Sequence, residues 1–167
     1  MESRAAILDA PVESARFSES RPASIETIDV DAPGPEEVLV EIKAASLCHT
    51  DVAIALGHID EQHPLIMGHE GAGIVRDVGN GVTTVEPGDH VVLGRVACGS
   101  CQFCRSGQGQ LCKERTETTR NGTLRDGTVR FSRNGERAYH CHGVSSFTET
   151  TVVNEEVAIG ITDGIPL

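Results

Sequence analysis

The sequence predicts a mainly β fold, and three segments carry that prediction. Residues 36–46 (EEVLVEIKAAS) alternate between two side-chain faces, which is typical of a half-buried strand. Residues 73–93 place apolar stretches around two turn signals, Gly79-Asn80-Gly81 and Pro87-Gly88-Asp89, and so predict paired strands. Residues 147–154 (FTETTVVN) predict a further strand. Aromatic residues make up only 3% of the chain, so the core must consist mostly of small aliphatic side chains.

Two other segments depart from this pattern. Residues 46–57 (SLCHTDVAIALG) predict a short helix, which Thr50 or Asp51 can cap. Residues 114–137 are rich in Arg, Thr, Gly and Asn and predict a long exposed excursion. The chain has 167 residues and no internal repeat, which indicates a single domain.

The charge balance excludes some classes of partner. The formal net charge is −11, so an acidic surface is expected to repel nucleic acid. Lys43 and Lys113 are the only lysines among fourteen basic residues, a balance that fits a high-salt cytoplasm and an ordinary acidic protein equally well. No apolar run approaches the ~20 residues that span a bilayer, and no secretory signal is recognisable at the start. We therefore expect a cytoplasmic protein without a membrane partner; a homo-oligomer is compatible with the sequence.

Four cysteines lie in one glycine-rich loop, ACGSCQFCRSGQGQLC, and follow the spacing C-x2-C-x2-C-x7-C. Four thiolates from one short loop can surround a tetrahedral zinc ion and leave no position for chemistry, which predicts a structural zinc. An iron–sulfur cluster is the alternative, but the bacterial ferredoxin pattern continues with three residues to a Cys-Pro. The third interpretation of the four cysteines is that they form disulfides or remain free thiols. The predicted zinc ligands are Cys98, Cys101, Cys104 and Cys112.

A second group of candidate ligands lies upstream, in CHTD (48–51) and GHE (68–70). Cys48 and His69 together offer two of the three protein ligands that an open catalytic zinc site needs. Asp51 can orient the His69 ring by accepting its second N–H. The Thr50 hydroxyl lies two residues from the candidate thiolate and is placed to pass a proton.

These motifs together resemble the zinc-dependent medium-chain alcohol dehydrogenases. The resemblance rests on GHEGAGIV-x2-VG-x-GV, then PGD, the four-cysteine loop, DGTVRF and SSFTETTVV, and it runs from about Val38 to Leu167. The CHTD form and the long insert are most similar to the class III and benzyl-alcohol-type branches. The resemblance implies a GroES-like, partly open β-barrel with a few short helices and a zinc-binding loop at about 95–115.

The resemblance also implies roles for individual residues. Cys48 and His69 would bind the catalytic zinc, with Glu70 as the nearby carboxylate that can approach or replace a ligand. Thr50 would hold the substrate oxygen and begin the proton relay, Asp51 would orient the histidine, and His49 would face the coenzyme pyrophosphate. The implied reaction oxidises a primary or aromatic alcohol, or an S-hydroxymethyl-thiol adduct, to the aldehyde level with hydride transfer to NAD(P).

Three departures from the family pattern limit this expectation. The family's third zinc ligand, a cysteine, belongs a few residues beyond the position of Leu167, and no G-x-G-x-x-G coenzyme motif is present. Residues 1–167 are therefore expected to be an incomplete amino-terminal catalytic domain that turns over little by itself.

The triplet His140-Cys141-His142 predicts a surface loop with a free thiol; the alternative is that Cys141 is a substitute zinc ligand. Arg115 stands one residue out of register with the arginine that holds glutathione in the class III branch. A non-catalytic zinc-binding structural module is the alternative function.

Overall fold

The fold is taken from a computed structural model that describes residues 1–95, 97–162 and 164–165. Val96, within the expected zinc-binding lobe, and Leu167 lie outside the described residues. Short strands dominate, and the helices are few and short, which confirms the mainly β prediction. The elements in chain order are β1 (Glu2–Leu8), α1 (Phe17–Ser20), β2 (Ala23–Val30), β3 (Glu37–Ala45), α2 (His49–Ala55), β4 (Leu65–Ile66), β5 (Gly71–Val78), β6 (His90–Leu93), α3 (Gln102–Arg105), the 3-10 helix η1 (Gly109–Leu111), α4 (Lys113–Asn121), β7 (Phe131–Arg133), β8 (Glu136–His140), β9 (Thr150–Asn154), the 3-10 helix η2 (Glu155–Val157) and β10 (Ala158–Gly160).

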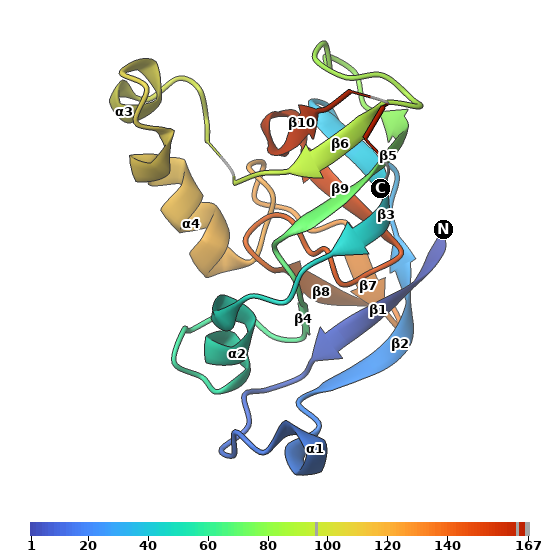
Figure 1. The fold of residues 1–167 in the computed structure, drawn as a ribbon, viewed down its shortest axis with the longest axis vertical. Coiled ribbons are helices and arrows are strands. Elements are labelled where there is room, and N and C mark those ends of the chain that lie inside the picture. The colour runs from blue at the N-terminus through green and yellow to red at the C-terminus, as the bar shows by residue number, and fades with distance from the viewer. Residues whose placement is uncertain (96, 163, 166–167) are drawn as a thin grey trace.

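The strands form two packed layers (Figure 1). One layer is a closed barrel with the strand order β1-β2-β7-β8-β4, and the other is a five-stranded sheet with the order β10-β6-β5-β3-β9. Neighbouring strands run antiparallel except β4 and β8, which are parallel. The barrel encloses an apolar cluster that includes Ile7, Ile28 and Phe131.

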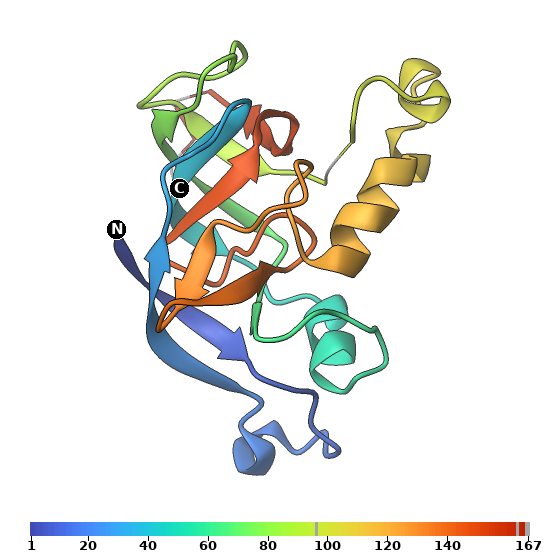
Figure 2. The same cartoon turned by 180° about the vertical axis from the view of Figure 1, so that it is seen from behind.

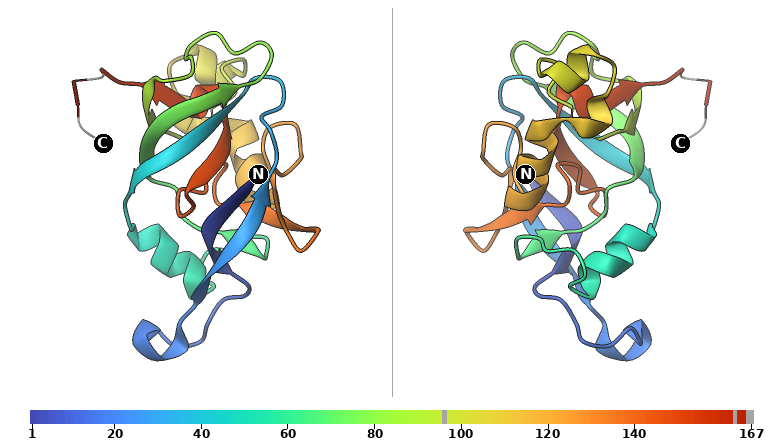
Figure 3. Two further views of the ribbon diagram at one scale, coloured as in Figure 1. Left: turned by 90° about the vertical axis from the view of Figure 1, so that its right-hand side faces the viewer. Right: turned by 90° about the vertical axis from the view of Figure 1, so that its left-hand side faces the viewer.

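Strand β3 is buried on both faces over its first half. Val38 and Val40 point into the core of the five-stranded sheet, whereas Leu39 joins the barrel cluster. The sequence alternation was interpreted as a half-buried strand, and that interpretation is wrong for residues 37–40, because β3 lies between the two layers. Its second half, at Lys43, Ala44 and Ala45, is exposed and leads directly to α2 (Figure 3).

The expected excursion at 114–137 is only partly an excursion. It contains most of α4, whose helix ends at Gly122 in the left-handed conformation, and all of β7. Leu124 and Phe131 are almost fully buried within the barrel cluster. The polar composition of the segment hides these two isolated apolar residues, which join it to the barrel core.

The expected surface loop at residues 140–142 is wrong. His140 ends β8 and Cys141 follows it, and both side chains are fully buried. The His140 ring packs on Phe131 with a centroid distance of 4.4 Å, and its Nε2 accepts the Arg130 backbone N–H at 3.2 Å. Burial, with Arg130 nearby, lowers the pKa of His140 to about 3, so the ring is neutral in the folded protein.

The helices lie at two places around the strands. Helices α3 and α4 project together from one side of the strand layers, as the front and back views agree (Figures 1 and 2). Helix α2 lies at the end of β3, away from α3. Among the described residues, no helix has the length and apolar character needed to cross a bilayer.

Two candidate metal centres

The four-cysteine loop brings all of its thiols together. The sulfur atoms of Cys98, Cys101, Cys104 and Cys112 lie within 4.8 Å of one another. The Sγ atoms of Cys98 and Cys104 are 3.9 Å apart. Four Zn–S bonds of about 2.3 Å at tetrahedral angles place sulfur atoms about 3.8 Å apart, so the cluster fits a zinc ion closely. The described residues include all six cysteines of the chain, and all six are free. The disulfide interpretation is therefore not supported.

The loop backbone stabilises negative charge on this cluster. The Ser100 hydroxyl and the Cys101 backbone N–H both donate to the Cys98 sulfur, at 3.5 and 3.3 Å, and they lower the pKa of Cys98 to about 6. Burial and the adjacent Cys101 thiol instead raise the pKa of Cys104 to about 12. Four adjacent thiols cannot all ionise without a cation among them. The donor set therefore fits a thiolate-binding metal such as zinc.

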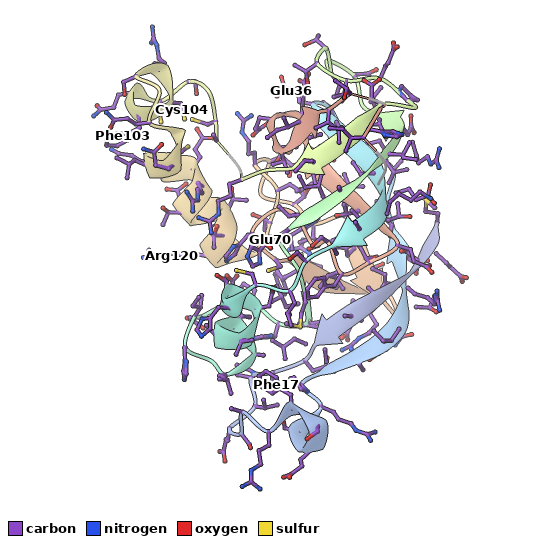
Figure 4. All side chains as sticks on the ribbon, in the orientation of Figure 1. Phe17, Glu36, Glu70, Phe103, Cys104 and Arg120 are labelled. Carbon is purple, nitrogen blue, oxygen red and sulfur yellow. The ribbon has the colours of Figure 1, made fainter. Side chains whose placement is uncertain are left out.

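The second centre is assembled from two elements distant in sequence. Cys48 is the N-cap of α2, and His69 and Glu70 lie in the connection from β4 to β5. Ligand atoms of these three residues lie within 4.8 Å of one another. Sulfur, imidazole and carboxylate are all zinc ligands, and three protein ligands leave one position for a water or substrate. Glu70 lies between the strands and α2, well apart from Cys104 in the α3 lobe (Figure 4).

Asp51 ties the two halves of this centre together. Its Oδ2 accepts the backbone N–H of Cys48 at 2.9 Å, which closes a capping box at the start of α2. Its Oδ1 lies 3.2 Å from His69 Nδ1, so the expected hydrogen bond between Asp51 and the histidine is present. That bond leaves Nε2 of His69 as the ligand atom. The sequence prediction that Thr50 or Asp51 would be the cap itself is wrong, because both lie inside the helix.

Cys48 and His69 influence each other's protonation. Three neighbouring groups lower the pKa of the Cys48 thiol. In decreasing order of effect, they are the Thr50 backbone N–H, the Thr50 hydroxyl and His69. The Cys48 Sγ and Thr50 Oγ1 are 3.6 Å apart. The Asp51 hydrogen bond raises the pKa of His69 against the opposing effect of burial. A thiol with a lowered pKa is more readily present as the thiolate that binds metal.

Glycine is required immediately before His69. Gly68 has a φ of +88°, and a Cβ at this position would lie 2.5 Å from a Phe147 ring carbon and 2.6 Å from the Ser146 hydroxyl. A side chain would therefore strain the backbone and displace the segment that packs against it. The Gly-His-Glu sequence is thus explained by close packing as well as by its donor atoms.

The remaining predicted residues lie close to this centre, but they do not all belong to its ligand group. Thr50 and Asp51 are in the first turn of α2, and His49 begins that helix with an exposed side chain. Cys141 groups with Asp51 and His69 within 4.8 Å, yet it is not in the group that contains Cys48. It therefore lies on the Asp51 side of the histidine and is a poor substitute ligand for the same ion. Burial raises the pKa of the Cys141 thiol well above its ordinary value.

Two residues near the centre were not predicted as site residues: Glu61 belonged to no motif, and His142 was assigned only to an expected surface loop. The Nε2 of His142 lies 3.0 Å from Glu61 Oε1, and the His142 ring centroid is 5.1 Å from that of His69. Glu61 is in the loop after α2, and that loop lines a groove of about 950 Å³ opposite η1 and α4. Arg115 and Arg120 line the other side of the groove. Neither Cys48 nor His69 lines it, so the groove adjoins the candidate centre through Glu61 and His142.

The two layers of strands and the two ligand clusters define a metal-binding domain of mainly β structure. The chain belongs to a specific family of such domains, because the family model described as "Alcohol dehydrogenase GroES-like domain" matches residues 34–163. This match confirms the resemblance inferred from the motifs.

Curated relatives and solved structures agree with this family. The chain is 46% identical over 157 residues to S-(hydroxymethyl)glutathione dehydrogenase of Escherichia coli O1:K1 / APEC, a match that covers 93% of this chain and 40% of the relative. A zinc-binding-domain alcohol dehydrogenase protein from Burkholderia ambifaria superposes with a TM-score of 0.90 at 34% identity and covers 100% of this chain and 44% of that chain. Benzyl alcohol dehydrogenase from Acinetobacter calcoaceticus gives a TM-score of 0.85 at 27% identity, with 99% and 42% covered. The chain thus spans about 40% of the length of the curated relatives it matches.

Proposed function

We propose that this chain is the catalytic-domain part of a zinc-dependent alcohol dehydrogenase. The observation that carries the proposal is the convergence of Cys48, His69 and Glu70, with the His69 ring held by buried Asp51. A metal-ligating histidine usually donates its other N–H to a carboxylate in this way. The four-cysteine loop would hold a second, structural zinc, and the chain matches about 40% of the length of the curated relatives.

The proposed reaction assigns each residue of the centre a task. A zinc ion held by Cys48 and His69, with Glu70 as the nearby carboxylate that can stand in for a third ligand, would supply Lewis acidity that makes an alcohol more acidic. The Thr50 hydroxyl, which lies beside Cys48, would accept the alcohol proton and pass it on. NAD(P) would accept the hydride, and exposed His49 at the start of α2 would contact its pyrophosphate.

The proposed substrate is a primary or aromatic alcohol or an S-hydroxymethyl-thiol adduct. Arg115 and Arg120 provide cationic groups along the groove, which suits a substrate with an anionic tail. The Arg115 guanidinium also donates to the Gln110 carbonyl at 2.9 Å, so it is held against the cysteine loop. The names of the matched relatives support both substrate types.

Metal content distinguishes this proposal from a non-catalytic zinc module. We expect the purified chain to bind two zinc ions, measured by elemental mass spectrometry, and Cys48→Ala to bind one, because the second centre loses its thiolate. Cys141→Ala serves as the control and should keep both ions, since its sulfur is outside the Cys48 group. Equal zinc content in the wild type and Cys48→Ala would favour the structural module.

We also expect the isolated chain to show little or no turnover. Hydride transfer requires a bound coenzyme, and a G-x-G-x-x-G motif is missing from the sequence. The measurement is NAD or NADP reduction at 340 nm with benzyl alcohol and with ethanol. NAD or NADP reduction faster than in a protein-free control would contradict this expectation. If Cys48→Ala abolished that activity, the result would still support the metal centre.

A further inference from the structure

Two carboxylate–histidine pairs lie side by side in this domain. Asp51 holds His69, and Glu61 holds His142 with a distance of 3.0 Å between Oε1 and Nε2. Both carboxylate side chains are fully buried, and the histidine side chains are 6% and 11% exposed. The two imidazole rings are neighbours, with centroids 5.1 Å apart and a tilt of 46°. The second pair therefore places another buried carboxylate beside another imidazole, next to a candidate metal ligand, although its contact is to Nε2 and lacks the hydrogen bond that Asp51 forms with Nδ1 of His69.

The surroundings of Glu61 indicate that its carboxylate positions the His142 imidazole. Within the described part of the chain, neither oxygen of its buried carboxylate has a hydrogen-bond partner of good geometry, so His142 is its one close polar contact. A buried carboxylate with so few partners is unfavourable unless a nearby group requires it. His142 also has a φ of +53°, a conformation that non-glycine residues seldom adopt. Strain of this kind is concentrated at functional sites.

His142 lies close to the metal centre without being part of its ligand set. The group of mutually close ligand atoms contains Cys48, His69 and Glu70 and does not contain His142. Because Nε2 of His142 lies 3.0 Å from the buried Glu61 carboxylate, Nδ1 is the ring nitrogen that remains for an external ligand. An imidazole nitrogen accepts a hydrogen bond when unprotonated and donates one when protonated, and a hydroxyl group can match either state.

We propose that His142, positioned by Glu61, hydrogen-bonds a second polar group of the molecule bound beside His69, so that the site prefers alcohols with another hydroxyl near the reacting carbon. This inference rests on the proposed function, because it requires a metal at Cys48, His69 and Glu70. His142 is then a specificity-determining residue, and Glu61 is a positioning residue that acts through it.

The test compares two thiols that differ at one group. The chain is loaded with Co²⁺, and 2-mercaptoethanol and 1-propanethiol are titrated while the visible absorption of the cobalt is followed, with Cys48→Ala as the spectral blank. Both thiols offer the same sulfur to the metal, but one ends in a hydroxyl and the other in a methyl group. We expect the preference for 2-mercaptoethanol to fall about fivefold in His142→Phe, the effect of one neutral hydrogen bond.

Further variants separate positioning from folding. Glu61→Gln should reduce the preference for 2-mercaptoethanol by less than His142→Phe does. It leaves the His142 imidazole in the protein but removes the charge of the carboxylate that positions it. His58→Phe is the matched control, since His58 is exposed in the same loop and should leave the preference unchanged. Cobalt content and far-UV circular dichroism are measured for every variant.

The possible results have distinct meanings. If the chain binds two cobalt ions and the preference is the same in the wild type, His142→Phe and Glu61→Gln, the inference is wrong and the proposed function stands. If the chain binds only one cobalt ion, in the cysteine loop, both are wrong. Should His142→Phe fail to fold, the result with Glu61→Gln decides, because an unchanged preference there removes the positioning role.

Discussion

Replacing Cys104 with serine is expected to remove one zinc ion per chain and to unfold the loop around it. The four sulfur atoms come from residues 98–112, and this loop has little apolar contact to hold it without a metal. Zinc-finger peptides gain about 10–16 kcal/mol on binding zinc, so the ion contributes most of the loop's stability. The measurements are zinc content and amide hydrogen exchange across residues 97–112.

Ser106→Ala is the control for this prediction. Ser106 lies in the same loop, and its hydroxyl donates to the Phe103 carbonyl without contacting a sulfur atom. We expect full zinc content and unchanged exchange in this variant. Full zinc content in Cys104→Ser, or a brown protein with the absorbance of an iron–sulfur cluster in the wild type, would contradict the structural-zinc interpretation.

Replacing Glu37 with alanine is expected to destabilise the domain strongly. Glu37 is 1% exposed and forms a bidentate pair with Arg130, with both N–O distances 2.7 Å, while its Oε2 also accepts the Gly34 N–H. Removing one partner of a buried ion pair leaves the other charge without compensation and costs about 3–5 kcal/mol. For a domain of this size we expect Tm to fall by roughly 10 °C or more.

An exposed ion pair provides the comparison for Glu37. Glu149 pairs with Arg4 across the surface, and both side chains are more than half exposed. Because solvent screens such pairs, Glu149→Ala should change Tm only slightly. Similar shifts in the two variants, measured by differential scanning calorimetry, would show that burial of the Glu37–Arg130 pair does not matter.

The five-stranded sheet was more predictable from the sequence than the barrel. Strands β3, β5 and β6 carry alternating or apolar segments and turn signals, so their local sequence identifies them. The barrel depends on pairings between distant segments, such as β4 with β8, that no local pattern encodes. The same reason explains the error at His140 and Cys141. The residue types suggested a surface, whereas His140 is buried against Phe131 and Arg130, and Cys141 lies in the apolar cluster of Leu8 and Leu65.

The two metal centres differ in predictability for a related reason. The cysteine loop needs only its own spacing, so the sequence identifies it directly. The candidate catalytic centre was predicted by combining two short motifs, and the hydrogen bond that Asp51 accepts from His69 follows from that combination. Glu61 and His142 are far apart in sequence; Glu61 matches no motif, and the triplet that contains His142 was interpreted as a surface loop. Only the folded arrangement shows that they face each other beside His69.

The distribution of the ligands along the chain has a consequence for how the protein assembles during synthesis. The cysteine ligands all lie within residues 98–112, so this loop can capture its ion as soon as that stretch leaves the ribosome. The centre at Cys48, His69 and Glu70 instead requires α2 to dock beside β5, and its neighbour His142 is synthesised later still. Cys48, His69 and Glu70 leave the ribosome before the cysteine loop does, but their candidate site also needs this docking step, whereas the loop site needs only local closure of the chain.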